Sequence, residues 1–179
     1  MASSVLPPTT MHRSLLVGLL VVACGQSAPK PASWTIYSTA QKDDPPGGVR
    51  ITATVPGDWE TEADAMGSPS FKHAQSGPLG LAAIVLFPCR EPNDKDEKAC
   101  VDKVVSYEFD KDDLARSKTS EIGGHRWIEA TNPANGRVHA RLFIPVTAAR
   151  AVVMCVAMMV EPKDLPAVRA FCETVKVGG

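Results

Sequence analysis

The sequence predicts an α+β domain in which helices cover an antiparallel β-sheet. Short runs of alternating apolar and polar residues recur along the chain, and the 15 prolines and 13 glycines favour short strands over long helices. Two predicted strands, 81–87 and 151–160, are apolar on both faces, which indicates that other elements cover both sides of the sheet. Two further segments have the apolar spacing of amphipathic helices.

Before this domain, the first 23 residues have the features of a secretory signal. His12 and Arg13 provide a positive start, and residues 15–23 are apolar except for one glycine. This run is too short to span a bilayer, which needs about 20 apolar residues, but it fits the apolar region of a signal peptide. It ends in Val21-Val22-Ala23-Cys24, which resembles the lipobox of bacterial lipoproteins.

The resemblance implies three modifications at this point of the chain. The thiol of Cys24 receives a diacylglyceryl group, cleavage follows between Ala23 and Cys24, and the new amino group is acylated. Two alternatives stay open, namely a plain cleaved signal followed by an unrelated cysteine, and a buried hydrophobic strand. Translation can begin at Met1 or at Met11. In a Gram-negative host, Gly25 rather than an aspartate favours the outer membrane.

Residues 24–33 are expected to form the lipidated cysteine and a short flexible linker, because Gly25–Ser33 is small, polar and proline-containing. The remaining residues, 34–179, suffice for a single domain with its own core. Arg13 is the only Lys or Arg before Cys24, so the mature chain carries 18 basic and 20 acidic residues, a net charge of −2. No basic stripe accumulates, which argues against a nucleic-acid partner.

The first half of the domain is predicted to contain strands and one helix. A turn cluster at 43–48 separates the first two strands, and Pro56-Gly57-Asp58-Trp59 closes the second. The helix is expected from Asp94 to Phe109, capped by Asn93 or Asp94. The predicted strands are 34–39, 49–55, 69–73 and 81–87.

The second half is predicted to be an antiparallel meander followed by a terminal helix. Strands 118–122 and 125–130 flank Gly123-Gly124, a strong hairpin signal. Strands 137–144 and 151–160 follow. The last helix is expected from Leu165 to Lys176, with Asp164 as its cap and Pro166 in its first turn.

This order of elements resembles the PsbP/Mog1-like α/β/α sandwich. The resembling features are the segment Val49–Trp59 ending in Pro-Gly-Asp-Trp, the hairpin Glu121–Trp127, and the closing strand with helix Leu165–Val175. The resemblance covers most of residues 34–177 and rests on pattern and order. It implies a domain that binds and organises larger assemblies. No functional residue of that family corresponds to a matching position here.

Four cysteines follow Cys24, and the expected oxidising location makes disulfides the default. Four cysteines allow three pairings. We favour Cys89–Cys100 and Cys155–Cys172, since each would join a strand to the helix that follows it. The alternative is buried free thiols. A zinc site is disfavoured because the chain has no CxxC motif or close Cys/His pair.

Several other residues invite a functional interpretation. Each also has a structural interpretation: the histidines as surface residues, the acidic groups as solvated helix ends, and the methionines and tryptophans as core or core-rim side chains. A metal site or general base would draw on the histidines, and a calcium site on the acidic groups. The residues are His73, His125 and His139; Asp94, Asp96, Glu97, Asp110, Asp112 and Asp113; Met154, Met158 and Met159; Trp59 and Trp127.

With no recognisable catalytic constellation, cofactor motif or metal cluster, the sequence favours a non-catalytic binding or assembly module. Its expected partners are the membrane, through the lipid anchor, and a protein of the cell envelope. One alternative is a hydrolase-like envelope enzyme with a site built from His125, His139 and Glu129. Another is a small-ligand carrier with an apolar cavity near Trp59 or Trp127.

Overall fold

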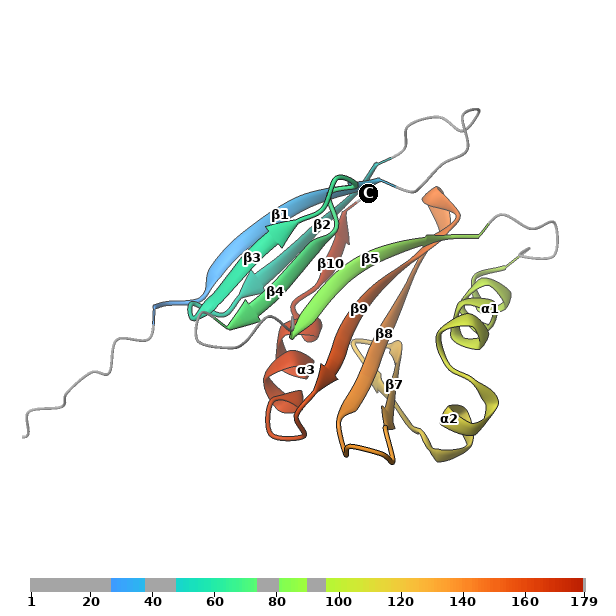
Figure 1. Cartoon of the computed structure of the whole chain (residues 1–179). Helices are drawn as coiled ribbons and strands as arrows, with labels where there is room; N and C mark the ends of the chain where they lie inside the picture. Colours follow the sequence, from blue (N-terminus) through green and yellow to red (C-terminus); the bar gives the residue numbers. More distant parts are fainter. Residues whose placement is uncertain (1–26, 38–47, 74–80, 90–95, 179) are drawn as a thin grey trace, which may run out of the picture.

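The computed structural model describes residues 27–37, 48–73, 81–89 and 96–178, and their fold is α+β, as predicted (Figure 1). These residues form two antiparallel sheets and three α-helices. The signal peptide 1–23, the lipidation site Cys24, Gly25 and most of the turn 43–48 lie outside the described residues.

Seven strands form the larger sheet, in the order β3-β4-β5-β9-β8-β7-β6. Its centre is β5 (Ala82–Pro88) and β9 (Ala151–Val160), the two strands predicted to lack a polar face. They pair along their length, from Ala82↔Ala157 to Pro88↔Ala151. The other strands are β3 (Trp59–Ala63), β4 (Pro69–His73), β6 (Lys118–Ile122), β7 (His125–Thr131) and β8 (Val138–Val146).

Three strands form a second, smaller sheet, so the prediction of one sheet is wrong. The order is β1 (Lys30–Tyr37), β2 (Gly48–Val55), β10 (Lys176–Gly178). The alternate apolar residues of β2 are buried, as its sequence pattern predicted. The three residues of β10 pair with β2 from the far end of the chain. A strand this short gives no periodic signal that a sequence can show.

β1 begins four residues before Trp34, the predicted start of the domain. The backbone of Lys30–Ser33, expected to belong to the linker, pairs with Thr52–Val55 of β2. Pro31 is compatible with this pairing because β1 is an edge strand, where one side of the backbone needs no hydrogen bonds. Residues 30–33 therefore belong to the first strand and not to the linker predicted for 24–33.

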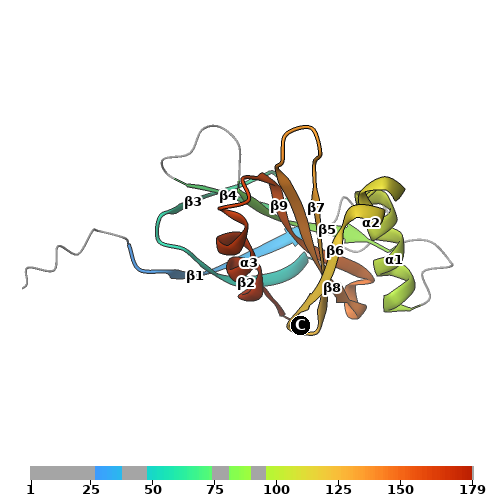
Figure 2. The same ribbon diagram turned by 90° about the horizontal axis from the view of Figure 1, so that it is seen from below.

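The larger sheet has a separate core on each face. Figure 2 shows α3 on one side of this sheet and α1 with α2 on the other. On one face, Ile84, Trp127 and Val153 pack against the smaller sheet and the last helix, α3 (Leu165–Glu173). On the other face, Phe143 and Met154 pack against α1 (Glu97–Glu108). The predicted cover on both sides is confirmed, although one of the two layers includes a sheet.

The first predicted helix, 94–109, corresponds to α1, and a short helix that was not predicted follows it. α1 begins at Glu97, and its cap is Asp96, whose carboxylate accepts the Ala99 N–H at 2.6 Å. The predicted caps, Asn93 and Asp94, lie outside the described residues. After extended backbone at Phe109, Asp110 caps the short helix α2 (Lys111–Arg116). A second capping aspartate thus starts a new helix directly after the first.

The last helix ends at Glu173, three residues before the predicted end at Lys176. The chain then turns and contributes β10 to the smaller sheet. Asp164 occupies the cap position, but its side chain makes no capping hydrogen bond. Instead, its carbonyl oxygen accepts the Val168 N–H at 3.2 Å. Pro166 lies in the first turn, as predicted.

Near its end, β9 contains one residue more than the facing part of β8. Val138 pairs with Val160, whereas Ala140 pairs with Ala157, which makes this a β-bulge. Met159 adopts a left-handed backbone conformation with φ 53°. The N–H of Met158 bonds to the Leu81 carbonyl at 3.1 Å, and its side chain is 46% exposed. The bulge therefore presents a large apolar side chain to solvent.

Candidate functional site

The two disulfides have the pairing that the sequence favoured. Cys89, after β5, is bonded to Cys100 in α1, and Cys155 in β9 is bonded to Cys172 in α3. The Cα atoms of each pair are 5.7 Å apart, in the range of ordinary disulfides. Each bond fixes one covering helix to a central strand of the larger sheet. The cysteines are therefore structural side chains of the two cores.

A polar cluster lies between β8 and the junction of α1 with α2. Its centre is the buried ring of Phe109, which the edge of His139 meets at a centroid distance of 5.1 Å. The guanidinium of Arg141 lies 4.8 Å from the same ring centroid. Glu108 Oε2 is 2.6 Å from Arg141 Nε, an ion pair without hydrogen-bond alignment. The cluster attaches the helix junction to the outer face of the sheet.

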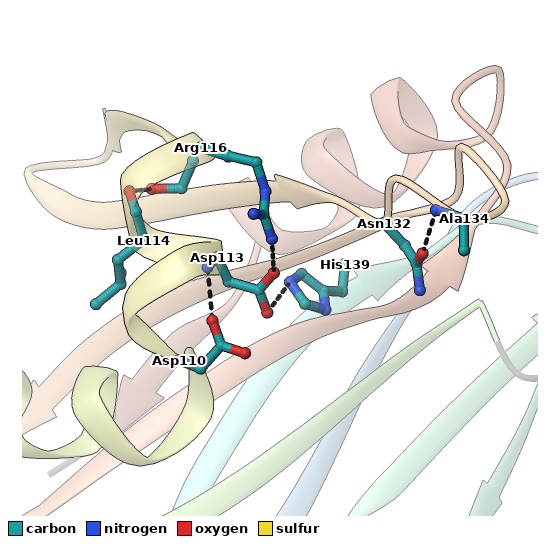
Figure 3. A network of polar contacts seen from close by, with 8 residues as sticks. Asp110, Asp113, Leu114, Arg116, Asn132, Ala134 and His139 are labelled. Carbon is teal, nitrogen blue, oxygen red and sulfur yellow. Dashed lines mark hydrogen bonds and ion pairs between the residues drawn. The ribbon is translucent and has the colours of Figure 1, made fainter.

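Asp113 of α2 connects this cluster to the first turn of its own helix (Figure 3). One carboxylate oxygen accepts a hydrogen bond from Arg116 at 3.3 Å, and the other lies 3.7 Å from His139 Nε2. The Asp113 N–H donates to the capping carboxylate of Asp110 at 2.6 Å. His139 Nε2 is buried and makes no hydrogen bond within the described residues. The acidic group 110–113 thus caps and positions α2.

Opposing charges surround His139. Burial lowers the pKa of its imidazole, and the neighbouring Arg141 guanidinium acts in the same direction. The carboxylates of Asp113, Asp110 and Glu108 raise that pKa, but the net shift is downward. His139 makes no hydrogen bond to a hydroxyl or thiol in the part of the chain that the structure describes. The site holds fixed charges, but it does not present a nucleophile to the histidine.

Glu129 lies on the opposite face of the sheet from His139. His139 pairs with Ala130, and residues directly opposite in a sheet point to the same side. Glu129 pairs instead with Ala140, a residue of the other core, so its side chain points the opposite way. The enzymatic site suggested from His125, His139 and Glu129 does not assemble.

On its own face, Glu129 joins the hairpin of β6 and β7 to α3. Its carboxylate accepts a hydrogen bond from the Trp127 indole at 2.6 Å and another from Arg169 at 3.2 Å. Arg169 also donates to Ser120 at 3.3 Å. A second ion pair, Asp102–Arg126 at 2.7 Å, attaches α1 to β7 on the other face. Both contacts hold a covering helix in place.

The two tryptophans considered as pocket residues belong to the core. Trp127 is fully buried, and its indole N–H is satisfied by Glu129. Trp59 lies at the edge of the same core, with its ring 5.2 Å from the Phe171 ring centroid. His73 meets Trp59 edge-on and lies 3.1 Å from the Asp58 carboxylate. These contacts fit the structural interpretation of both tryptophans.

The remaining candidates are separated from one another. Met154 is buried in the core under α1, Met158 is exposed, and His125 lies at the β6–β7 hairpin. No group of three or more His, Cys, Asp or Glu side chains able to hold a metal ion occurs among the described residues. Likewise, no helix within those residues is long and apolar enough to cross a membrane. Asp94 lies outside the described part of the chain.

Comparison with known proteins found no family model and no curated protein that matches the chain.

Sequence reasoning missed Arg141, Glu108 and Phe109, which form the centre of the polar cluster. One signal was available: alternation along residues 137–144 places His139 and Arg141 on the same polar face. It could not show that a second short helix would cover that face.

Proposed function

We propose that the chain is a membrane-anchored bacterial lipoprotein whose domain is a non-catalytic binding or assembly module facing the periplasm. The observation that carries the proposal is Val21-Val22-Ala23-Cys24, directly after a short apolar run with a positive start. Attachment at Cys24 would add several acyl chains. One chain gives only marginal membrane binding, whereas several together make release negligible.

The disulfides support export to an oxidising compartment. All four cysteines of the described domain are paired, and such bonds are rare in reducing compartments. Cys24 is then the one cysteine of the chain left for lipidation. In a Gram-negative cell, Gly25 favours the outer membrane as the destination.

The fold we propose for the domain is PsbP/Mog1-like. Supporting features are the antiparallel order of the larger sheet, the closing strand β9 with helix α3, and cover on both faces of the sheet. The resemblance brings an expectation of binding to larger assemblies and no residue assignments. Together with the separation of Glu129 from His139, it favours a protein partner in the envelope over a reaction.

Mass spectrometry of the protein extracted from membranes tests the anchor. We expect a chain that begins at residue 24 and carries a diacylglyceryl group and one further acyl group. The matched variant Cys24→Ser removes the thiol and should leave the domain without acyl mass. A native chain that begins elsewhere, or that is soluble and carries no lipid, would refute the anchor.

Crosslinking of the acylated protein in intact cells, followed by purification under several growth conditions, tests the assembly role. We expect one envelope protein to be recovered reproducibly with the native chain. Failure to recover any partner reproducibly would count against the assembly role while leaving the anchor intact.

A further inference from the structure

The point at which the chain enters the domain is fixed by a close contact. The backbone of Ser27 lies directly against Gly57, in the turn between β2 and β3. A Cβ atom at position 57 would collide with the Ser27 carbonyl group, so only glycine permits this approach. Ser27 is therefore held at the end of the domain where β1 begins and β2 ends.

This contact leaves a very short tether behind Cys24. Three residue steps separate Cys24 from Ser27, which span about 10 Å when fully extended. A domain of this size has a radius of gyration of about 15 Å. A lipid on Cys24 would hold the Gly57 turn near the bilayer surface, whereas the opposite end of the domain would be much farther away.

Strand pairing places Met158 at that same end. Trp59 follows the Gly57 turn, and from β3 the sheet continues through β4 and β5 to β9. Three interstrand steps at about 4.8 Å amount to about 14 Å across the sheet. Ala82 pairs with Ala157, so Met158 lies at the start of β5 and close to the tether end of the sheet. The molecule therefore presents an exposed methionine near the point where its tether enters.

At this end of the domain, some charged side chains form ion pairs within the protein and others do not. Asp58 contacts His73 at 3.1 Å, and Glu161 contacts Arg137 at 3.3 Å. Lys30 and Lys163 are exposed, and neither forms an ion pair with another described residue. Two lysine ammonium groups thus remain available for lipid phosphates.

We infer that this end of the domain rests on the bilayer surface, with Met158 in the headgroup region and Lys30 and Lys163 against lipid phosphates. The inference rests on the proposed lipid anchor. Because the lipid anchor already keeps the domain close to the membrane, a weak contact with the bilayer suffices to set the orientation of the domain. A tenfold preference for this orientation requires only about 1.4 kcal/mol. The domain would then present the start of α1 and the far ends of β5 and β8 to the periplasm.

Site-specific quenching tests this orientation on the acylated full-length protein. Met158→Cys and Tyr37→Cys each provide one free thiol for a small fluorophore, since the domain cysteines are in disulfides. The two positions are matched in exposure, at 46% and 47%, and Tyr37 lies at the opposite end of β1 from Lys30. The proteins are reconstituted in vesicles of phosphatidylethanolamine and phosphatidylglycerol that contain a nitroxide-headgroup lipid.

We expect quenching to be several-fold stronger at position 158 than at position 37, and the difference to vanish in detergent. Charge reversal by Lys30→Glu together with Lys163→Glu should reduce the difference. Equal quenching at both positions, or a probe at 158 shielded by a second copy or another protein, would overturn the inference. The intact mass of the same samples separates the two failures: missing acyl mass refutes the anchor, whereas acylated protein with equal quenching refutes only the orientation.

Discussion

The guanidinium of Arg141 lies over the ring of Phe109, with its central carbon 4.8 Å from the ring centroid. Arg141 belongs to β8, whereas Phe109 separates α1 from α2, so this contact joins the sheet to the bend between two helices. Glu108 pairs with the same guanidinium at 2.6 Å. A single side chain therefore provides both a cation–π contact and an ion pair at the helix junction.

Replacing Arg141 with methionine should lower the free energy of unfolding by about 2 kcal/mol, because it removes the cation–π contact and leaves a partly buried carboxylate without its partner. Urea denaturation measures the change. The matched control is Arg116→Met, which removes a more exposed ion pair of the same helix region and should cost less than about 1 kcal/mol. Equal losses in the two variants would contradict a special role for Arg141.

Truncating Phe109 to alanine should destabilise the domain by roughly 3–5 kcal/mol, because the ring is almost completely buried and the change leaves a cavity. The control Tyr107→Ala removes a nearby aromatic ring of α1 that is 62% exposed and stacks on Phe87. We expect that control to cost less than about 1 kcal/mol. Thermal or urea unfolding distinguishes the two, and a mild effect at Phe109 would show that the junction can collapse without strain.

Much of the fold could be predicted because its signals are local. Strand β9 is a continuous apolar run, which indicates a strand that is covered on both faces. Gly123-Gly124 marks the hairpin between β6 and β7, and both glycines have the positive φ that this turn requires. The disulfide pairing followed from the same local order, since each bond connects a strand to the next helix.

The parts that could not be predicted depend on contacts between distant segments. β10 has three residues and exists because β2 offers an edge for pairing. Lys30–Ser33 resembles a linker in composition, yet the backbone of β2 makes it a strand. In the candidate site, alternation placed His139 on a polar face, but the burial of that face by Phe109 and α2 is a tertiary event. The sequence pattern therefore predicts which face of a strand a side chain lies on, but it does not predict which distant element covers that face.

Removing either disulfide should lower stability by about 3 kcal/mol in a chain-entropy estimate, because the bonds close loops of similar length, with separations of 11 and 17 residues. The paired variants are Cys89→Ala with Cys100→Ala, and Cys155→Ala with Cys172→Ala. Hydrogen exchange should report different local effects: faster exchange in α1 for the first pair and in α3 for the second. Exchange that increased uniformly in both variants would show that neither bond acts on its own helix.

Acid should destabilise the domain through His139 before it affects the carboxylates. Burial holds the pKa of this histidine below its ordinary 6.5 in the folded protein, so the unfolded chain binds more protons as the pH falls. Its contribution to stability is therefore complete above about pH 7.5 and is lost progressively as the pH falls from 6.5 towards the lower pKa of the folded protein. Denaturation midpoints measured from pH 8 to pH 5 follow this loss.

The variant His139→Gln should flatten the pH profile in that range, whatever its effect on stability at pH 8, because it removes the proton-binding group. His73→Gln is the matched control, and its profile should keep the parent's slope because His139 is unchanged. The pKa of Asp102 is held below its ordinary 3.8 by the hydrogen bond from Lys98 and by Arg126, so its stabilising effect is lost only below about pH 3.8. If stability in His139→Gln depended on pH as steeply as in the parent protein, the acid sensitivity would belong to another group and not to the buried imidazole.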